Sequence, residues 1–175
     1  KLTNNSANNI AEFVKNLIPV KGRMTVINQR QPFELIIDYA HTPDALENVL
    51  KTLIDLKPEG GVTCVFGCGG NRDKTKRPEM AAIAGKYAER VIVTSDNPRN
   101  EDPYEIIKDI KSGMDLKMKA KSLFISDREE AIRTAILTAN PGSIILVAGK
   151  GHEDYQIING VKHHFDDKEI ILETF

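Results

Sequence analysis

The sequence lacks an excess of charge of either sign and any long apolar run, and each absence excludes a class of protein. Its 24 Lys and Arg residues nearly balance 25 Asp and Glu residues, so no overall field draws the chain to nucleic acid. The longest apolar stretches, such as residues 144–149, are far too short to span a membrane, and the amino end carries no signal-peptide pattern. We therefore expect a cytoplasmic protein with neither a nucleic-acid partner nor a membrane partner.

Cysteine is also scarce. The two cysteines, Cys64 and Cys68, are too few for a disulfide framework, and they lack the further Cys or His pair that a structural zinc site needs. We interpret Cys64 as a small buried strand residue and Cys68 as a loop residue, and we expect no metal site. With 175 residues, of which 41% are hydrophobic, the chain is long enough for one main domain with its own core.

Apolar runs of strand type alternate with amphipathic helical patterns through most of the chain. The runs are rich in β-branched residues and lie at residues 62–66, 90–95, 121–126 and 143–149. Continuous apolar strands separated by helices are typical of a sheet that is buried on both faces. The pattern predicts an α/β fold with an open, doubly wound, mainly parallel sheet. Ahead of it, residues 24–29 and 33–38 are predicted to form an amino-terminal hairpin.

Capping signals predict where several helices begin. These signals are Thr42 with Pro43, Asp102 with Pro103, and Ser126. A further helix is indicated by the apolar stripe within residues 80–87. The tail predicts a short edge strand at residues 161–165 and then a last capped helix. At the amino end, residues 6–18 predict a helix that ends at Pro19, and a chain that starts inside such a pattern is expected to be a piece of a longer one.

Four loops follow predicted strands, at residues 38–42, 67–77, 95–102 and 149–156. Because the carboxyl ends of parallel strands lie on one rim of a sheet, these loops are expected to meet where ligands bind. They collect charges of both signs, namely Arg72, Lys74, Arg77, Arg99 and Lys150 against Asp38, Asp96, Asp102, Glu153 and Asp154. A bare phosphate would gain nothing from the acids, whereas an amino acid needs carboxylates for its ammonium and an arginine fork for its carboxylate.

Two interpretations of these charges remain open from the residues alone. Asn97 and Pro98 shape a turn, and Arg99 with Asp96 could recognise opposite charges on one small molecule. Alternatively, the charges pair with one another or with water, as surface charges usually do. The glycine cluster within residues 67–70 could present backbone amides to an anion, yet it matches neither G-x-G-x-x-G nor the Walker pattern, and the latter occurs nowhere in the chain.

Four motifs in order resemble the carboxyl-terminal domain of the Mur ligase family. They are DYAHTPDALENVL, VFGCGGNRDKTKRPEM, TSDNPRNEDP and AGKGHEDYQ, and the resemblance runs from about Gly22 to the end of the chain. It implies a Rossmann-like carboxyl-terminal domain at residues 22–175, with residues 1–21 as the end of a preceding ATPase domain. The likeness is greatest to the branch that adds the third residue of the peptidoglycan stem peptide, and it implies a monomeric, ATP-dependent amide ligase as the full-length protein.

The resemblance also implies roles for residues of the rim. Asp96, Asn97, Pro98 and Arg99 match the DNPR motif of members that select meso-diaminopimelate over lysine, with Arg99 on the distal carboxylate. The other matches to the same pocket are Arg72 as a second arginine, and Gly149 and Glu153 as a backbone group and a carboxylate that hold the distal amino acid end.

The same resemblance implies cofactors and partners that lie mostly outside this chain. Arg23, Asp38 and His41 match positions that contact ATP or ADP from the carboxyl-terminal side. In the family, ATP with Mg²⁺ activates a carboxylate of UDP-N-acetylmuramoyl-dipeptide, and the amine of diaminopimelate attacks it. The nucleotide-gripping loop, the metal ligands and the catalytic groups belong to a preceding domain. This chain alone is therefore expected to hold no cofactor firmly and to be inactive.

Simpler interpretations and rival functions stand beside this one. His41 could only bond the backbone at a helix start, while His152 and the pair at residues 163–164 are interpreted as structural or exposed. A folylpolyglutamate synthase domain of the same fold is one rival, against which the DNPR and GKGHEDYQ motifs argue. A non-catalytic binding module of this fold is the other.

Overall fold

The computed structural model describes residues 20–175, and the helix predicted at residues 6–18 lies outside them. The described part is built on a six-stranded sheet with the order β1-β2-β6-β3-β4-β5. All neighbouring strands are parallel except β1 and β2, which form the predicted antiparallel hairpin. The strands are β1 (Thr25–Ile27), β2 (Glu34–Asp38), β3 (Val62–Phe66), β4 (Arg90–Val93), β5 (Ser122–Phe124) and β6 (Ile144–Ala148). The predicted fold class is confirmed.

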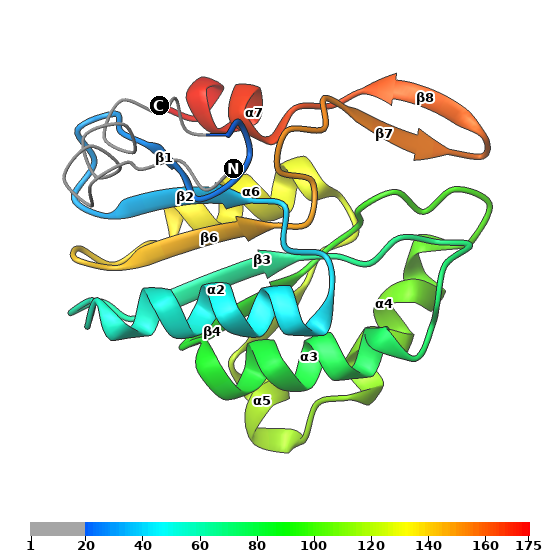
Figure 1. The fold of residues 1–175 in the computed structure, drawn as a ribbon, viewed down its shortest axis with the longest axis horizontal. Helices are drawn as coiled ribbons and strands as arrows, with labels where there is room; N and C mark the ends of the chain where they lie inside the picture. Colours follow the sequence, from blue (N-terminus) through cyan, green and yellow to red (C-terminus); the bar gives the residue numbers. More distant parts are fainter. Residues whose placement is uncertain (1–19) are drawn as a thin grey trace, which may run out of the picture.

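Helices cover both faces of this sheet, as Figure 1 shows. One face packs against α2 (Pro43–Asp55), α3 (Lys76–Tyr87) and α4 (Pro103–Ser112), and the other against α6 (Arg128–Leu137) and α7 (Asp167–Glu173). Successive strand residues alternate between the two cores because side chains point to opposite faces of a sheet. In β3, Cys64 faces the first core and Val65 faces the second. Both faces are thus apolar, which is why the sequence shows continuous apolar runs.

The helix starts follow the capping signals with one exception. The Thr42 side chain accepts a hydrogen bond from the backbone N–H of Ala45, and Asp102 accepts one from Tyr104 N–H, as predicted for α2 and α4. The helix start predicted at Ser126 was wrong by one residue. Asp127, not Ser126, caps α6, because the Asp127 carboxylate reaches the N–H of Glu130 at 3.0 Å. A short helix, α5 (Leu116–Ala120), was not predicted.

The tail differs from the prediction in one respect. The strand expected at the edge of the sheet, β8 (Val161–His164), pairs with β7 (Tyr155–Ile158) in a separate two-stranded sheet. Asn159 and Gly160 join the two strands with φ of 51° and 77°, as a tight hairpin turn requires. The Asn-Gly pair was a readable signal for this hairpin. Figure 1 shows the hairpin beyond the carboxyl ends of the sheet strands, beside the loops that were expected to bind a ligand.

Among residues 20–175, no helix is both long and apolar enough to cross a membrane.

Candidate functional site

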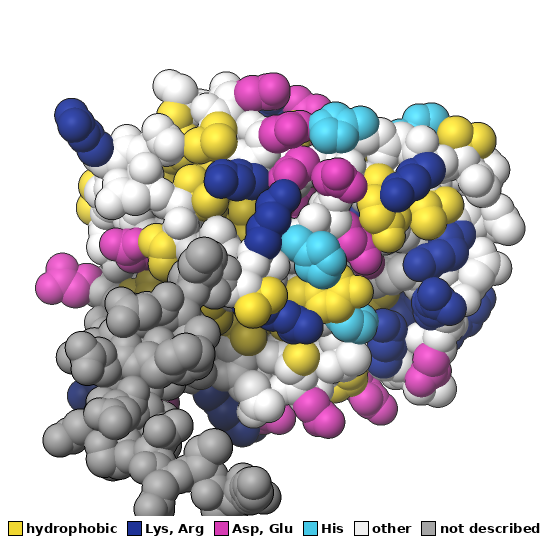
Figure 2. Space-filling model, turned by 45° about the horizontal axis from the view of Figure 1, so that its top comes forward, with side chains coloured by type: hydrophobic (Ala, Val, Ile, Leu, Met, Phe, Trp, Pro, Cys, Tyr) yellow, Lys and Arg dark blue, Asp and Glu magenta, His cyan; other side chains and the backbone are white. Residues whose placement is uncertain are grey.

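The four rim loops meet around one cavity of about 340 Å³ at the carboxyl ends of the strands. Of the predicted diaminopimelate residues, the structure brings six to its wall: Arg72, Asp96, Asn97, Arg99, Gly149 and Glu153. His41 also lines the cavity, whereas Pro98, Arg23 and Asp38 do not. Tyr39 and Tyr155 line it too, although no role was predicted for either. Figure 2 shows a face of the molecule on which acidic, basic and histidine side chains lie close together.

Asn97 joins three of these loops. It is buried, with 4% of its surface exposed, and its amide nitrogen Nδ2 donates to Glu153 Oε2 at 3.0 Å. Its Oδ1 accepts from the backbone N–H of Ile157 at 2.9 Å, and its backbone carbonyl accepts from Gly70 N–H at 2.9 Å. The turn therefore fixes the loops after β3 and β6 and the start of the β7–β8 hairpin relative to one another.

The glycine loop owes its composition to a close approach between backbones. A Cβ atom on Gly70 would lie 1.9 Å from the carbonyl oxygen of Pro98, and one on Gly69 would lie 2.8 Å from Arg99 Nη1. Only glycine lets the two loops pack so tightly. The Gly70 amide already donates to Asn97, so it is not free to cradle an anion. The glycine cluster was expected to offer backbone amides to an anion, but the Gly70 amide bonds the neighbouring turn instead.

The backbone and side chain of Arg99, which follows the turn at Asn97 and Pro98, are held by several hydrogen bonds. Its φ of 55° is unusual for a residue with a side chain, and hydrogen bonds with β7 and the hairpin turn fix its backbone. Its Nη1 donates to Gly70 O at 2.9 Å and to Asn97 O at 3.3 Å. Among the described residues, Nε and Nη2 have no hydrogen-bond partner, so part of the guanidinium fork remains for a ligand.

Arg72 lies near Arg99 at the glycine loop, since a Cβ atom on Gly69 would lie 3.7 Å from Arg72 Cγ and 2.8 Å from Arg99 Nη1. It is exposed and lines the cavity, and it makes no hydrogen bond or ion pair with any described residue. The two arginines thus give one part of the cavity a positive character.

Other charges of the rim pair with one another, as the alternative interpretation expected. Arg77 is completely buried and contacts Glu101 Oε2 at 3.0 Å and Asp109 Oδ2 at 2.8 Å. Lys74 contacts Glu101 at 3.2 Å, and Asp102 caps α4. The charged residues of the loop at residues 95–102 therefore divide: Glu101 and Asp102 hold the scaffold, while Asp96 and Arg99 line the cavity.

The acidic part of the cavity consists of Asp96 and Glu153. Asp96 is 8% exposed, and burial raises the pKa of its carboxyl group, an effect that the Arg128 and Lys150 charges oppose. Lys150 is completely buried, and its Nζ lies 3.7 Å from Asp96 Oδ1 and 3.5 Å from Glu153 Oε2. Burial also lowers the pKa of Lys150.

Arg128 holds the backbone next to this acidic part of the cavity, and the sequence analysis did not predict its role. The loop after β5 was interpreted as a plain helix cap, yet it supplies a fully buried arginine with a bidentate pair to Asp167 at 2.8 and 2.7 Å. The same guanidinium donates to the carbonyls of Ser95 and Ala148 at the ends of β4 and β6. Two helix starts are thereby tied to the rim.

The predicted nucleotide residues surround Tyr39. The Arg23 guanidinium lies 4.9 Å from the Tyr39 ring centre, and His41 Nδ1 lies 2.8 Å from the Tyr39 carbonyl oxygen. Both side chains are exposed. Asp38 is 4% exposed, and its two carboxylate oxygens accept from the N–H groups of Met24 and Ala40, each at 2.8 Å. Asp38 therefore has a structural task of its own, which the sequence did not reveal.

The remaining candidates for chemistry have simpler places. The His152 ring lies against Tyr39 at 5.3 Å, and His163 and His164 lie on the exposed β8. Within residues 20–175, no group of three His, Cys, Asp or Glu side chains could hold a metal ion. Cys64 and Cys68 are buried, and burial raises the pKa of each thiol to about 12.

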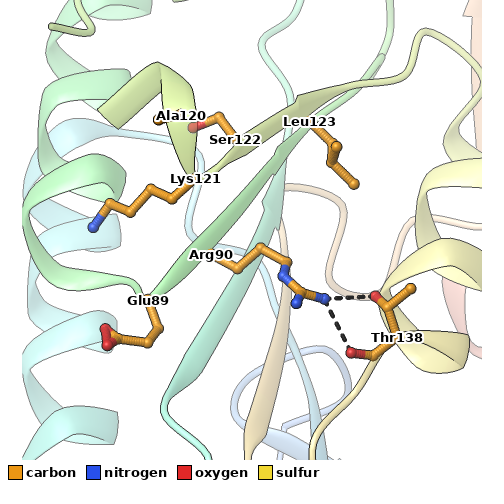
Figure 3. A pocket seen from close by; sticks show the side chains of 7 residues that line it. All are labelled: Glu89, Arg90, Ala120, Lys121, Ser122, Leu123 and Thr138. Carbon is orange, nitrogen blue, oxygen red and sulfur yellow. Dashed lines mark hydrogen bonds between the residues drawn. The ribbon is translucent and has the colours of Figure 1, made fainter. Parts of the chain in front are cut away.

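A larger cavity of about 510 Å³ lies at the opposite end of β4 and β5 (Figure 3). There Arg90 donates to the carbonyl and the hydroxyl of Thr138 at 3.0 and 2.7 Å, and the Lys121 ammonium donates to the Ala88 carbonyl. Nη1 of Arg90 and the Lys121 ammonium thus bind oxygens of the chain itself, and Glu89 is the one acid among the described residues that line this cavity, whereas the rim cavity is lined by two acids and two arginines. The smaller cavity at the carboxyl rim is therefore the better candidate for binding a charged ligand.

Comparisons with known proteins show what this chain is similar to. The family described as "Mur ligase, glutamate ligase domain" matches residues 22–151. A UDP-N-acetylmuramoyl-L-alanyl-D-glutamate–2,6-diaminopimelate ligase of Bacteroides fragilis is 56% identical over 163 residues, which are 93% of this chain and 34% of that ligase.

Two solved structures are also similar to this chain, to different degrees. A structure named for the same ligase has 47% identity and a TM-score of 0.82, covering 95% of this chain and 34% of its own. The folylpolyglutamate synthase of Thermotoga maritima has 25% identity and a TM-score of 0.56, covering 82% of this chain and 31% of its own. The chain thus spans about a third of the length of these relatives.

Proposed function

This chain belongs to the Mur ligase family, and from that premise we propose that it is the part of a diaminopimelate-adding ligase that holds the incoming amino acid. The family match begins at residue 22, which supports an amino acid-binding domain at residues 22–175 preceded by the end of an ATPase domain. Folylpolyglutamate synthase, the rival with the same fold, is less similar both in sequence and in structure.

The observation that carries the proposal is the division of charge within one cavity. Arg72 and Arg99 line it together with Asp96 and Glu153, so it offers partners for a carboxylate and for an ammonium at the same time. meso-Diaminopimelate carries both groups at its distal end, whereas lysine carries only the ammonium. With lysine bound, the free donors of Arg99 would be desolvated without a partner, and such unpaired polar groups are how sites reject analogues.

In the proposed reaction, this chain contributes orientation. Residues outside this chain would hold ATP and Mg²⁺, which would supply the phosphoryl group that activates the terminal carboxylate of UDP-N-acetylmuramoyl-L-alanyl-D-glutamate. By fixing the distal end of diaminopimelate, Arg99 and Glu153 would aim its other amine at the carbonyl carbon of the activated carboxylate. The new amide bond forms as phosphate leaves. The exposed Arg23 and His41 fit the negative charge of a nucleotide, while Asp38 would act indirectly by holding the β1–β2 hairpin. We further propose a monomer in the cytoplasm.

Binding to the isotope-labelled chain tests the proposal most directly. Titration with meso-diaminopimelate is expected to shift the backbone amide resonances of Arg72, Asn97, Arg99 and Glu153 at the rim. L-Lysine and L-glutamate serve as matched ligands that lack the second carboxylate or the second amine. Larger shifts with L-glutamate than with meso-diaminopimelate would support the folylpolyglutamate synthase alternative instead.

A second expectation concerns activity. The 175-residue chain alone should neither hydrolyse ATP nor form the amide bond, because it carries no Walker sequence to grip the phosphates. Phosphate release by the purified chain is the measurement, and the full-length ligase is the positive control. ATP turnover by the chain, abolished when His41 or Arg72 is replaced by alanine, would overturn this expectation.

A further inference from the structure

Lys150 is a buried cation between two carboxylates, and the proposed function gives it no role. The Lys150 and Asn97 side chains approach the same two oxygens. Asn97 Nδ2 lies 3.4 Å from Asp96 Oδ1 and 3.0 Å from Glu153 Oε2, and Lys150 Nζ lies 3.7 and 3.5 Å from these atoms. The Lys150 ammonium also donates to the backbone carbonyl of Tyr155, which anchors it. Asp96 and Glu153 are thereby gathered around one charge.

Both carboxylates approach the same Asn97 amide nitrogen, so without the Lys150 charge their mutual repulsion would favour the uptake of a proton by the pair. Of the residues that the structure describes, Lys150 is the one basic side chain within 4.0 Å of either carboxylate. Arg128 is near enough to Asp96 to favour its ionised form, but its guanidinium is committed to Asp167, whose charge acts in the opposite sense. The other charged or titratable groups around the cavity are Tyr39, His41, Cys68, Arg72, Lys76, Arg99 and Tyr155.

We propose that Lys150 is a positioning residue for the amino end of the ligand, which keeps Asp96 and Glu153 ionised together in the empty cavity. The inference rests on the proposed function for the identity of the ligand. Two carboxylates and one lysine leave one net negative charge, which matches one incoming ammonium. Glu153 is then ready to accept a hydrogen bond from that ammonium, and no proton has to leave when the ligand binds.

Replacing Lys150 with methionine removes the charge while roughly keeping the length of the side chain. In this variant the Asp96–Glu153 pair takes up a proton when the cavity is empty, and the ligand ammonium has to expel it. Affinity for meso-diaminopimelate should then rise with pH by up to about tenfold per pH unit, whereas the wild-type affinity stays flat between about pH 6 and 8.

The first measurement needs no ligand. ¹³C resonances of the Asp96 and Glu153 carboxyl groups are followed against pH in the wild-type chain and in Lys150→Met. We expect the pair in the variant to take up a proton at least about one pH unit higher than in the wild type. Lys74→Met is the matched control, because Lys74 also pairs with a carboxylate, that of Glu101, but contacts neither Asp96 nor Glu153. Identical titrations in wild type and Lys150→Met would overturn the proposal.

The second measurement is calorimetry of meso-diaminopimelate binding in buffers of different ionisation enthalpy. The wild-type protein should release no proton on binding, whereas Lys150→Met should release up to about one proton per ligand bound near pH 6. A Lys150→Met protein that binds without proton release and without pH dependence would contradict the proposal. If wild type fails to bind meso-diaminopimelate, the proposed function fails, while the ligand-free titration still decides the role of Lys150.

Glu153→Gln covers the case in which Lys150→Met does not fold. Glu153 is partly exposed at the rim, with 18% of its side chain accessible, so its amide variant leaves the buried lysine in place. If the two carboxylates are coupled, the Asp96 carboxyl group should titrate at lower pH in this variant, because a neighbouring negative charge is gone. An unchanged Asp96 titration would show that the pair is not coupled and would overturn the proposal.

Discussion

Replacing Arg99 with alanine in the full-length ligase is expected to lower kcat/KM for meso-diaminopimelate by about 10²-fold, or ~3 kcal/mol, the scale of a lost bidentate contact between charged groups. The side chain lines the cavity, and its Nε and Nη2 have no partner among the described residues, so they remain available for the distal carboxylate. The value of kcat/KM for lysine should change little, because lysine has no distal carboxylate for this arginine to bind.

Part of the Arg99 effect is structural, and two further variants separate the contributions. Nη1 of Arg99 also bonds the carbonyls of Gly70 and Asn97, so alanine loosens the turn as well as the ligand contact. Arg99→Lys keeps the charge but loses the planar fork, and it should recover only a minor part of the selectivity. A loosened turn would lower the rates for diaminopimelate and lysine alike, whereas a lost carboxylate contact lowers the first alone.

Arg90 offers the matched control (Figure 3). Like Arg99, it is partly exposed and donates from Nη1 to two oxygens, those of Thr138, but it lies at the other end of the sheet. Arg90→Ala should leave both amino acid substrates unaffected. If Arg99→Ala retained the wild-type ratio of kcat/KM values for diaminopimelate and lysine, the assignment of Arg99 to the distal carboxylate would be wrong.

The fold was predictable because its signals are local. Apolar runs such as residues 62–66 and 143–149 lie in buried central strands, and Thr42-Pro43 and Asp102-Pro103 begin helices as their capping chemistry requires. The β7–β8 hairpin was missed even though Asn159-Gly160 indicates it, because residues 149–156 were interpreted as loop through to Gln156. The Ser126 cap failed because Asp127, one residue later, offers a charged carboxylate, which accepts a stronger hydrogen bond from the backbone than a hydroxyl does.

The site was predictable to a lesser degree. Topology dictates that loops after parallel strands meet, so the convergence of Arg72, Arg99 and Glu153 on one cavity followed from strand order alone. Which charges face the cavity did not follow, because pairing depends on side chains far apart in the chain. Arg77 lies in the same basic stretch as Arg72, yet it is buried against Glu101 and Asp109. Sequence spacing cannot distinguish these two arginines, whereas burial can.

Arg128 and Asp167 show the same limit more sharply. They lie 39 positions apart, at the first turns of α6 and α7, and nothing in either neighbourhood predicts the pair. An arginine at the start of a helix opposes the helix dipole, so its presence requires a compensating partner. That partner is the Asp167 carboxylate, and the pair also holds the carbonyls of Ser95 and Ala148. The acidic side of the cavity thus rests on a buried ion pair between two helix starts.

Replacing Arg128 with methionine is accordingly expected to lower the free energy of unfolding by about 3–5 kcal/mol, since it leaves the Asp167 charge buried and unpaired. Asp167 is 1% exposed, so water cannot replace the lost partner without local opening. Chemical denaturation of the chain measures the change. The double variant Arg128→Met, Asp167→Leu should recover a large part of the loss, because it removes both buried charges and fills the space with apolar groups.

Arg133→Met is the matched control, since both arginines lie on α6 and both contact acids. The Arg133 side chain is 33% exposed, and its Nη2 lies 2.9 Å from Glu129 Oε1. Solvent screens this pair, so the substitution should cost less than about 1 kcal/mol. Because the same replacement is made on the same helix, differences in helix propensity cancel. Equal losses of stability at positions 128 and 133 would mean that the buried pair contributes no more than a surface pair. The Arg128–Asp167 pair could then not be what stabilises the acidic side of the cavity.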